Sequence, residues 1–199
     1  MAPAVPDPIT DRVDDRSLGG LLHRRASGFD ARVDRVLDRL RGNAASDRVF
    51  YAASQLGDFS LIWHVLGSAR ALRAADPLSD ATRSATIIGA ESLLVNQGVK
   101  RLFDRTRPVH DAPHPHRLRR PSTSSFPSGH ASAAFVAAAI LSEGSRAAPA
   151  YYALAAVVAT SRTYVRVHHA SDVVAGAVLG CVLGRIAVRV WPRTPAPSG

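Results

Sequence analysis

Three long runs without a charged side chain dominate the C-terminal half of this chain. They cover residues 128–142, residues 147–161 and the stretch from Asp172 to Val190, which carries no further charge until Arg185. The runs are short and poor in Leu, but they are rich in the small residues that let membrane helices approach one another closely. They therefore favour an all-α fold built from closely packed apolar helices.

Two further apolar runs precede these three. Residues 49–69 are long enough to span a bilayer, although Asp58 and His64 interrupt them, and residues 84–103 form the second run. We therefore predict an all-α, polytopic transmembrane helix bundle of five spans, or six, in the cell membrane. A soluble helical protein is the alternative, because uncharged helices of about 15 residues also build soluble cores.

The N-terminal part has a different character. Residues 1–26 carry several prolines without sustained periodicity, so we predict a mobile arm there and no secretory signal peptide. From Ser27 to Gly42 apolar residues recur on one helical face, with Ser27 as a candidate cap and Gly42 as a stop. This amphipathic helix would lie on the membrane surface or dock on the bundle.

The predicted organisation has three parts. Residues 1–48 form the arm and the amphipathic helix, residues 49–192 form one membrane-embedded domain, and residues 193–199 form a disordered tail. The sequence carries no prediction of an oligomeric state.

Charge and cysteine content exclude several classes of function. Twenty-five basic and 16 acidic residues give a net charge of +9, but the arginines fall between the apolar runs and form no single patch, so we predict no nucleic-acid partner. Cys181 is the only cysteine, which excludes a disulfide framework and a cysteine metal site. His110, His114 and His116 lie in a proline-rich loop without the fixed geometry of a metal site, so we expect a basic rim there and no bound metal.

The segment from Ser161 to Asp172 contains a candidate nucleophile. His168 and Asp172 are four residues apart, so if the segment opens a helix the carboxylate can hold the imidazole. A held imidazole can act as a nucleophile, and Arg162 would supply the charge needed to attack a phosphoryl group. A polar loop between two apolar helices is the alternative interpretation.

Two upstream clusters favour the phosphoryl interpretation. Lys100 and Arg107 are seven positions apart, which is two helical turns, so both cations can reach one side of a helix before Pro108 ends it. The stretch Pro127-Ser128-Gly129-His130 precedes an apolar run, so backbone N–H groups at a helix start can face an anion.

Together these clusters resemble the three signature motifs of the type 2 phosphatidic acid phosphatase family. The matching patterns are Lys100-x6-Arg107-Pro108, then Pro127-Ser128-Gly129-His130, then Ser161-Arg162-x5-His168-x3-Asp172. The resemblance covers roughly residues 84–190 and none of residues 1–48. It implies a bacterial, membrane-bound, metal-independent lipid phosphate phosphatase without a cofactor.

The chemistry of phosphoryl transfer gives these residues distinct roles. His168 would attack phosphorus to form a phosphohistidine, Asp172 would fix its tautomer, and His130 would protonate the leaving alkoxide and then activate water. His169 is a competitor for the nucleophile, but its partner at four residues would be Val173. The expected phosphate contacts are Lys100, Arg107, Ser128, the backbone of Gly129, and Arg162.

Several functional alternatives stay open at this point. The lipid substrate could be phosphatidate, phosphatidylglycerol phosphate, or a polyprenyl phosphate, diphosphate or phosphoribosyl lipid. Vanadate-dependent haloperoxidases have a similar motif set but are soluble and much larger, and a non-catalytic scaffold or lipid-binding protein would need a missing motif residue. The distribution of arginines outside the spans favours an active site that faces the cytoplasm.

Overall fold

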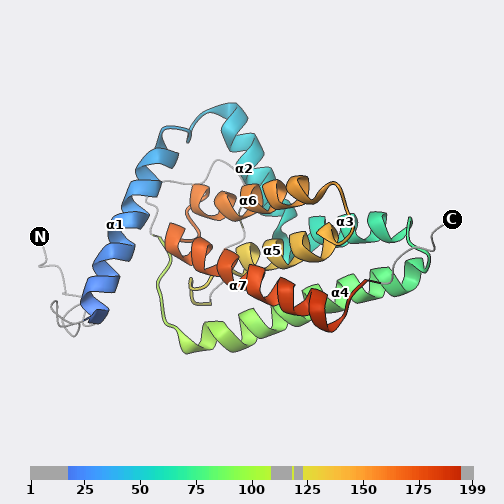
Figure 1. The fold of residues 1–199 in the computed structure, drawn as a ribbon. Coiled ribbons are helices and arrows are strands. Elements are labelled where there is room, and N and C mark those ends of the chain that lie inside the picture. The colour runs from blue at the N-terminus through green and yellow to red at the C-terminus, as the bar shows by residue number, and fades with distance from the viewer. Residues whose placement is uncertain (1–17, 109–117, 119–122, 194–199) are drawn as a thin grey trace, which may run out of the picture.

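The structure is a computed structural model that describes residues 18–108, 118 and 123–193. Within those residues every regular element is helical (Figure 1), which confirms the predicted all-α class. The α-helices are α1 (Leu18–Asp38), α2 (Ala44–Leu56), α3 (Leu61–Ala71), α4 (Pro77–Leu93), α5 (Gly129–Ser142), α6 (Ala148–Tyr164) and α7 (Ala170–Val190). Three short helical turns join some of them: η2 (Asp58–Ser60), η3 (Leu94–Gly98) and η4 (Val99–Leu102).

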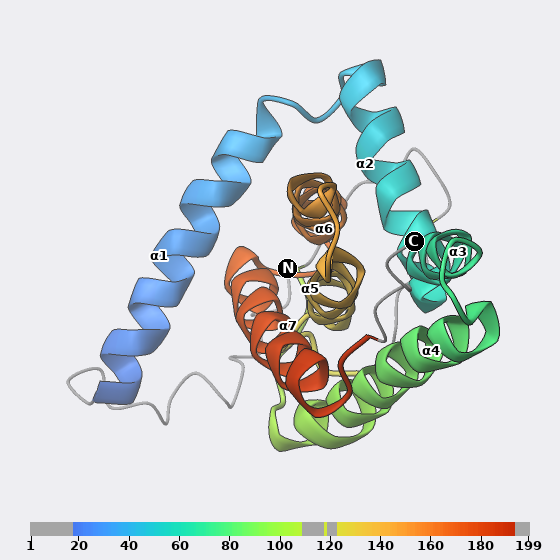
Figure 2. The same cartoon turned by 45° about the vertical axis from the view of Figure 1, so that its right-hand side comes forward.

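Helix α5 is the centre of the bundle. Ten of its 14 residues are buried, and α3, α4, α6 and α7 all contact it. Figure 2 shows α5 enclosed by these neighbours. A helix that is buried on all sides needs no polar face, which explains why its sequence is mostly apolar and contains no Asp, Glu, Lys or Arg.

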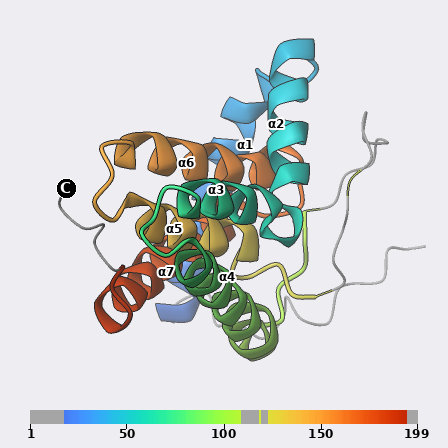
Figure 3. The same cartoon turned by 90° about the vertical axis from the view of Figure 1, so that its right-hand side faces the viewer.

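The helices around α5 alternate in direction. Arg70, near the end of α3, donates to the carbonyl oxygen of Ile140 near the end of α5, so α3 and α5 run the same way. Arg83, in the first half of α4, reaches Glu143 just beyond α5, so α4 runs the opposite way. Helix α6 returns from the end of α5, and α7 then runs parallel to α5 (Figure 3). As a result the last turns of α4 and α6 and the first turns of α5 and α7 meet at one end of the bundle.

Helix α7 has two different faces. Its glycines face α5 so closely that a methyl group at Gly176 or Gly180 would overlap the carbonyl oxygen of Ser128 or Ser132. The other face exposes an apolar stripe at four-residue spacing, made of Val174, Val178, Val182 and Ile186. Among the described residues, α7 is the one helix long and apolar enough to cross a membrane, and α5 is an apolar helix of 14 residues. The structure does not test the predicted number of spans.

The predicted single helix over residues 49–69 is wrong. The chain forms α2 and α3 with the turn η2 between them, and Phe59 and Ser60 adopt left-handed backbone angles (φ 54° and 57°). The break lies where the chain passes close to α5, because a Cβ atom on Gly57 would lie 2.8 Å from Cδ2 of His130. Asp58, which weakened the prediction of a span, turns toward His130 here.

The predicted boundaries of the N-terminal part also need correction. Helix α1 begins at Leu18, so residues 18–26 are helical and Ser27 lies inside the helix, whereas residues 1–17 lie outside the described part. Gly19 and Gly20 weaken the helical signal in the sequence. The helix packs on α6 and α7 and buries Leu37, although Val36 stays exposed, so α1 docks on the bundle (Figure 1). Most of the predicted disordered tail, residues 194–199, lies outside the described residues.

Candidate active site

The three motif clusters meet at the end of the bundle where α5 and α7 begin. The backbone N–H of Ser128, at the start of α5, donates to the carbonyl oxygen of Asp172 in α7 (3.0 Å). His168 lies in the connection between α6 and α7, and its N–H donates to the carbonyl oxygen of Arg162 (3.1 Å). Residues far apart in the sequence are therefore held within a few ångströms by backbone hydrogen bonds.

His168 sits between an anion and a cation. Its Nδ1 is 3.6 Å from Oδ2 of Asp172, and its Nε2 is 3.2 Å from a terminal nitrogen of Arg107. The expectation that both residues of the pair lie on one helix is wrong, because α7 begins only at Ala170. The predicted pairing occurs all the same, because Asp172 lies in the first turn of α7 and points back toward the preceding loop.

Burial controls the charge of His168. The residue is only 2 % exposed, and this burial, together with the charges of Arg107 and Arg162, outweighs the opposing contact with Asp172 and lowers the pKa of the imidazole to about 3. The ring is thus neutral at physiological pH. A neutral imidazole with Nδ1 facing a carboxylate presents the lone pair of Nε2, which is the atom a nucleophile requires.

Asp172 is fully buried and has further partners. One oxygen accepts from Arg105 at 2.6 Å, and the other accepts from the backbone N–H of His169 at 2.9 Å. His169 occupies the N-cap position of α7, and its Nε2 lies 3.3 Å from the carbonyl oxygen of Thr106. His169 thus caps α7, and the choice of His168 as the nucleophile stays a prediction.

The two cations of the first cluster do not share a helix. Lys100 lies in η4, which ends at Leu102, whereas Arg107 lies in the non-helical segment beyond it, so the predicted helical clamp is wrong. Both residues nevertheless lie near His168. Lys100 lines the same cavity as His168, and Arg107 is fixed by donating to the carbonyl oxygens of Val167 (2.8 Å) and Thr123 (3.1 Å).

The start of α5 has the predicted form. Ser128 is the N-cap, and its hydroxyl accepts from the N–H of Ala131 at 3.5 Å. The Ser128 side chain is fully buried and does not line the cavity, whereas Gly129 and His130 do. A Cβ atom on Gly129 would lie 2.8 Å from Oδ1 of Asn96, so only glycine fits between α5 and η3 without a shift.

His130 has a carboxylate partner that the sequence motif does not contain. Its Nε2 lies 2.9 Å from Oδ1 of Asp58, at the break between α2 and α3. The imidazole is therefore oriented by an acid, as His168 is by Asp172. The remaining ring nitrogen, Nδ1, is left for chemistry in the cavity.

Arg162 lies deeper than the other cations. It is 1 % exposed and donates to the hydroxyl and carbonyl oxygens of Ser54 in α2. Its carbonyl oxygen holds the loop that carries His168, as described above. The positive charge of Arg162 thus acts on His168, and its carbonyl oxygen fixes the loop that carries His168.

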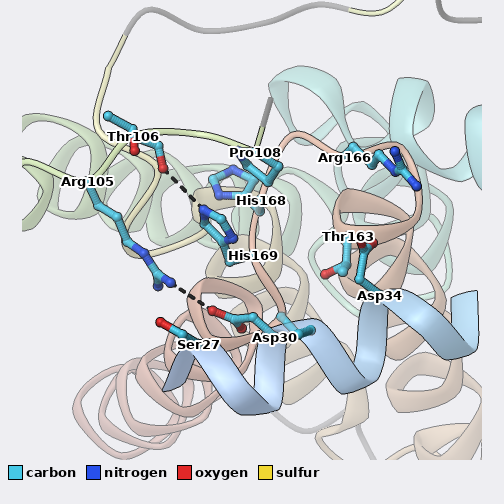
Figure 4. A pocket seen from close by; sticks show the side chains of 12 residues that line it. Ser27, Asp30, Asp34, Arg105, Thr106, Pro108, Thr163, Arg166, His168 and His169 are labelled. Atoms are coloured by element: carbon cyan, nitrogen blue, oxygen red, sulfur yellow. Dashed lines mark hydrogen bonds and ion pairs between the residues drawn. The ribbon is translucent and has the colours of Figure 1, made fainter. Parts of the chain in front are cut away.

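Two cavities flank His168. One, of about 370 Å³, is lined by Lys100, Gly129, His130, His168 and Thr123 among others. The second, of about 500 Å³, lies between α1 and the loop before α7, and its lining includes Asp30, Arg105, His168 and His169 (Figure 4). The first cavity therefore brings together His168, the predicted nucleophile, His130, the predicted acid–base residue, and the cation of Lys100.

The described residues contain no cluster of three or more His, Cys, Asp or Glu side chains that could hold a metal ion. His110, His114 and His116, which raised the question of a metal, lie outside the described residues.

Sequence reasoning missed the residues that hold the predicted ones in place. In the sequence, Asp58 only interrupts the apolar run of residues 49–69, and Arg105 is one more arginine between Lys100 and Arg107. Asp30 and Ser54 gave no signal, because their contacts join α1 and α2 to distant elements.

Comparison with known families agrees with this geometry. The family model described as the PAP2 superfamily matches residues 81–195, which include every predicted site residue. Two curated mycobacterial proteins, both named decaprenylphosphoryl-5-phosphoribose phosphatase, are also similar. The Mycobacterium tuberculosis protein is 34% identical over 67% of this chain and 73% of its own length. The Mycolicibacterium smegmatis protein is 35% identical over 75% and 81%, respectively.

Two crystal structures have a similar fold. One is a transmembrane PAP2-type phosphatidylglycerolphosphate phosphatase from Bacillus subtilis, with a TM-score of 0.65 and 23% identity over 88% of each chain. The other is LpxE from Aquifex aeolicus, with a TM-score of 0.63 and 25% identity over 80% of this chain and 94% of that one.

Proposed function

Because this chain belongs to the PAP2 superfamily of phosphatases, we propose that it is a multi-pass membrane enzyme that removes phosphate from a lipid through a phosphohistidine. One observation carries the proposal: the neutral, buried His168 lies between Asp172 and Arg107 and shares a cavity with Lys100 and His130. These are a nucleophile, its orienting acid, a second imidazole and cations for the phosphate, which is the set that phosphoryl transfer needs.

In the first step Nε2 of His168 attacks phosphorus, and the bond from phosphorus to the lipid oxygen breaks. Asp172 holds the proton on Nδ1 and stabilises the imidazole as it becomes positively charged. The Arg107 N–H that lies near Nε2 turns to a phosphate oxygen as the substrate enters. His130 gives its proton to the departing alkoxide, and Asp58, 2.9 Å from its Nε2, opposes the cost of protonating this largely buried ring.

In the second step His130 takes a proton from water, and the oxygen of that water attacks the phosphohistidine. The nitrogen–phosphorus bond breaks, inorganic phosphate leaves, and His168 returns to its neutral form. Lys100, Arg107, Arg162 and the N–H groups at the start of α5, which Ser128 caps, stabilise the negative oxygens in both transition states. With these cations in place the mechanism uses no metal ion.

The relatives favour a polyprenyl lipid that carries a phosphorylated sugar as the substrate class. The two mycobacterial proteins named above act, by their names, on decaprenylphosphoryl-5-phosphoribose. The apolar stripe on α7 supports a bilayer location, since it would face lipid while the site lies at the end of the same helix. Phosphatidate and phosphatidylglycerol phosphate are the competing substrates.

The test is phosphate release by detergent-solubilised protein from a panel of these lipids, with and without EDTA. We expect the polyprenyl sugar phosphate to have the highest kcat/KM and EDTA to have no effect. His168→Ala should abolish turnover, and acid-quenched labelling should place phosphate on His168 of the wild type. Label on a serine would contradict the mechanism. Activity that EDTA removes and that returns only with magnesium would contradict its metal independence. A preference for phosphatidate would contradict the proposed substrate class.

A further inference from the structure

Helix α1 places one buried acid against the active site. Most charged side chains of this helix, such as Arg32 and Arg35, are exposed, but Asp30 is only 9 % exposed. Burial of a carboxylate is costly unless it is paired and hydrogen-bonded. Asp30 also lies outside residues 81–195, which the family model matches.

Both oxygens of Asp30 are occupied at the start of α7. One accepts from the backbone N–H of Ser171 at 2.7 Å. The other accepts from the hydroxyl of Ser171 at 2.8 Å. It also accepts from Arg105 at 2.8 Å (Figure 4). Asp30 thus binds the residue next to Asp172 and the arginine that contacts Asp172.

Arg105 is shared between two acids. One terminal nitrogen donates to Asp30, and the other donates to Oδ1 of Asp172 at 2.6 Å and to Ser171 at 2.8 Å. The second oxygen of Asp172 is thereby left for His169 N–H and for Nδ1 of His168. A continuous chain of contacts therefore runs from α1 through Arg105 and Asp172 to the nucleophile.

We propose that Asp30 is a positioning residue of the active site, which acts through Arg105 to keep Asp172 available to His168. The reason is geometric. A guanidinium prefers to bind a carboxylate with two parallel N–H groups. Without Asp30, both nitrogens of Arg105 are free to bind both oxygens of Asp172, which draws its second oxygen away from His168.

Docking of α1 does not depend on Asp30 alone. Arg41, just after α1, donates to the carbonyl oxygens of Thr163 and Tyr164, both at 2.9 Å, and Leu37 is buried against the bundle. Asp30→Asn keeps the size of the side chain and one acceptor oxygen for Ser171. The variant should therefore fold while losing the charge that faces Arg105.

The inference rests on the proposed function, because kcat is its first readout. We expect Asp30→Asn to lower kcat about tenfold, by analogy with residues that orient metal ligands, whose loss costs about 10- to 100-fold in activity. KM should change by less than about twofold, since the phosphate contacts are untouched. Asp34→Asn is the matched control: Asp34 lies one turn further along α1 and lines the same cavity, but it pairs with Arg41, so this variant should keep wild-type kcat.

A double-mutant cycle separates action through Arg105 from a general loss of packing. If Asp30 acts through Arg105, the variant Asp30→Asn/Arg105→Gln should be no slower than Arg105→Gln alone. Losses that multiply would overturn the inference, as would a wild-type kcat in Asp30→Asn.

A measurement without turnover separates this inference from the proposed function. Ring-nitrogen NMR of His168, assigned with His168→Gln, reports which nitrogen carries the proton. Asp30→Asn should shift the population from the Nδ1–H toward the Nε2–H tautomer, whereas Asp34→Asn should not. If the wild type hydrolyses no lipid phosphate, the proposed function fails, but the tautomer shift still decides whether Asp30 positions His168. An unchanged tautomer population in Asp30→Asn would refute this positioning role.

Discussion

At the scale of single residues, the site consists of imidazoles held by acids. Asp172 faces His168, Asp58 faces His130, and Arg105 links Asp172 to Asp30. Each imidazole is thereby held with one nitrogen toward a carboxylate, and the other nitrogen of His168 faces Arg107. This orientation, more than the presence of histidine, is what makes the pair suited to nucleophilic and acid–base roles.

The low pKa of His168 predicts that its ring stays neutral at pH values well below the ordinary pKa of histidine. Its pKa of about 3 in the folded protein compares with about 6.5 in an unfolded chain. Between these two pH values the unfolded chain binds a proton that the folded protein does not, so stability falls as the pH falls through this window and is unaffected by His168 above it. NMR of the ring nitrogens in detergent should report a neutral His168 at pH 5.

A matched variant checks the consequence for stability. His168→Asn cannot bind this proton, so its melting temperature should fall less than that of the wild type between pH 7 and pH 5. A protonated His168 at pH 5, or equal losses in the two proteins, would show that burial does not control this ring.

The residues of the candidate site could be proposed from the sequence, but the residues that hold them in place could not. His168, His130 and the cations follow from spacing and from the chemistry of phosphate. Asp58 and Asp30 come from helices that approach the site only after folding, and no spacing rule connects residues so far apart. One prediction from helical spacing was also wrong. Arg107 lies beyond the end of η4 and not two helical turns after Lys100 on the same helix.

At the scale of elements, the last three helices could be predicted, although α6 runs on to Tyr164 and α7 begins at Ala170, but the break between α2 and α3 could not. Ser128 caps α5 where Pro and Gly punctuate the chain, so the sequence alone predicts that start. The break at η2 lies where Gly57 passes close to His130, and the apolar run by itself gives no sign of this tertiary contact. The functional partner of His130 lies at this unpredicted break.

The contact of α7 with α5 gives a prediction at this scale. Gly180→Ala places a methyl group against the carbonyl oxygen of Ser132 and a side-chain atom of Phe135, so the two helices must separate. Overpacking of this kind costs about 1–3 kcal/mol. We therefore expect a lower melting temperature in detergent and a loss of activity, because α5 and α7 both carry site residues at their first turns.

Gly89→Ala is the matched control, since nothing lies within 4 Å of a Cβ atom at that position in α4. The same exchange should there be neutral or slightly stabilising, because alanine favours a helix more than glycine does. Equal melting temperatures for the two variants would argue against close contact between α5 and α7.

At the scale of the whole molecule, the site and the N-terminal helix lie at one end of the bundle. Asp30 of α1 contacts Ser171 there, whereas Arg83 and Glu143 form an ion pair at the other end (2.6 Å). Helices α3 to α7 pass along the bundle in alternating directions (Figures 1 and 3). If each passage is a membrane span, the number of spans is odd, and α1 and the site share one side of the bilayer while the end of α7 lies on the other.

The side that the site faces decides whether the substrate is taken from the inner or the outer leaflet, and the cations favour the cytoplasm. In the predicted five-span topology, the sequence segments assigned to the site's side contain Arg24, Arg25, Arg41, Arg48, Arg117, Arg119 and Arg120, and those assigned to the opposite side contain Arg70, Arg73, Arg83, Arg146, Arg189 and Arg193. Cations near span ends, rather than net charge, set orientation, so this small excess predicts a cytoplasmic site.

Cysteine labelling on intact cells tests this orientation. Cys181 is first replaced by alanine. Thr123→Cys then reports the side of the site, because Thr123 lines the cavity of Lys100 and His130. Ala147→Cys reports the opposite side, because Ala147 is exposed in the connection from α5 to α6. An impermeant maleimide should label Ala147→Cys on intact cells and Thr123→Cys only after lysis, because the reagent cannot cross the bilayer to a cytoplasmic site. The reverse pattern would place the site outside the cell, and labelling of both positions on intact cells would contradict a membrane between the two ends of the bundle.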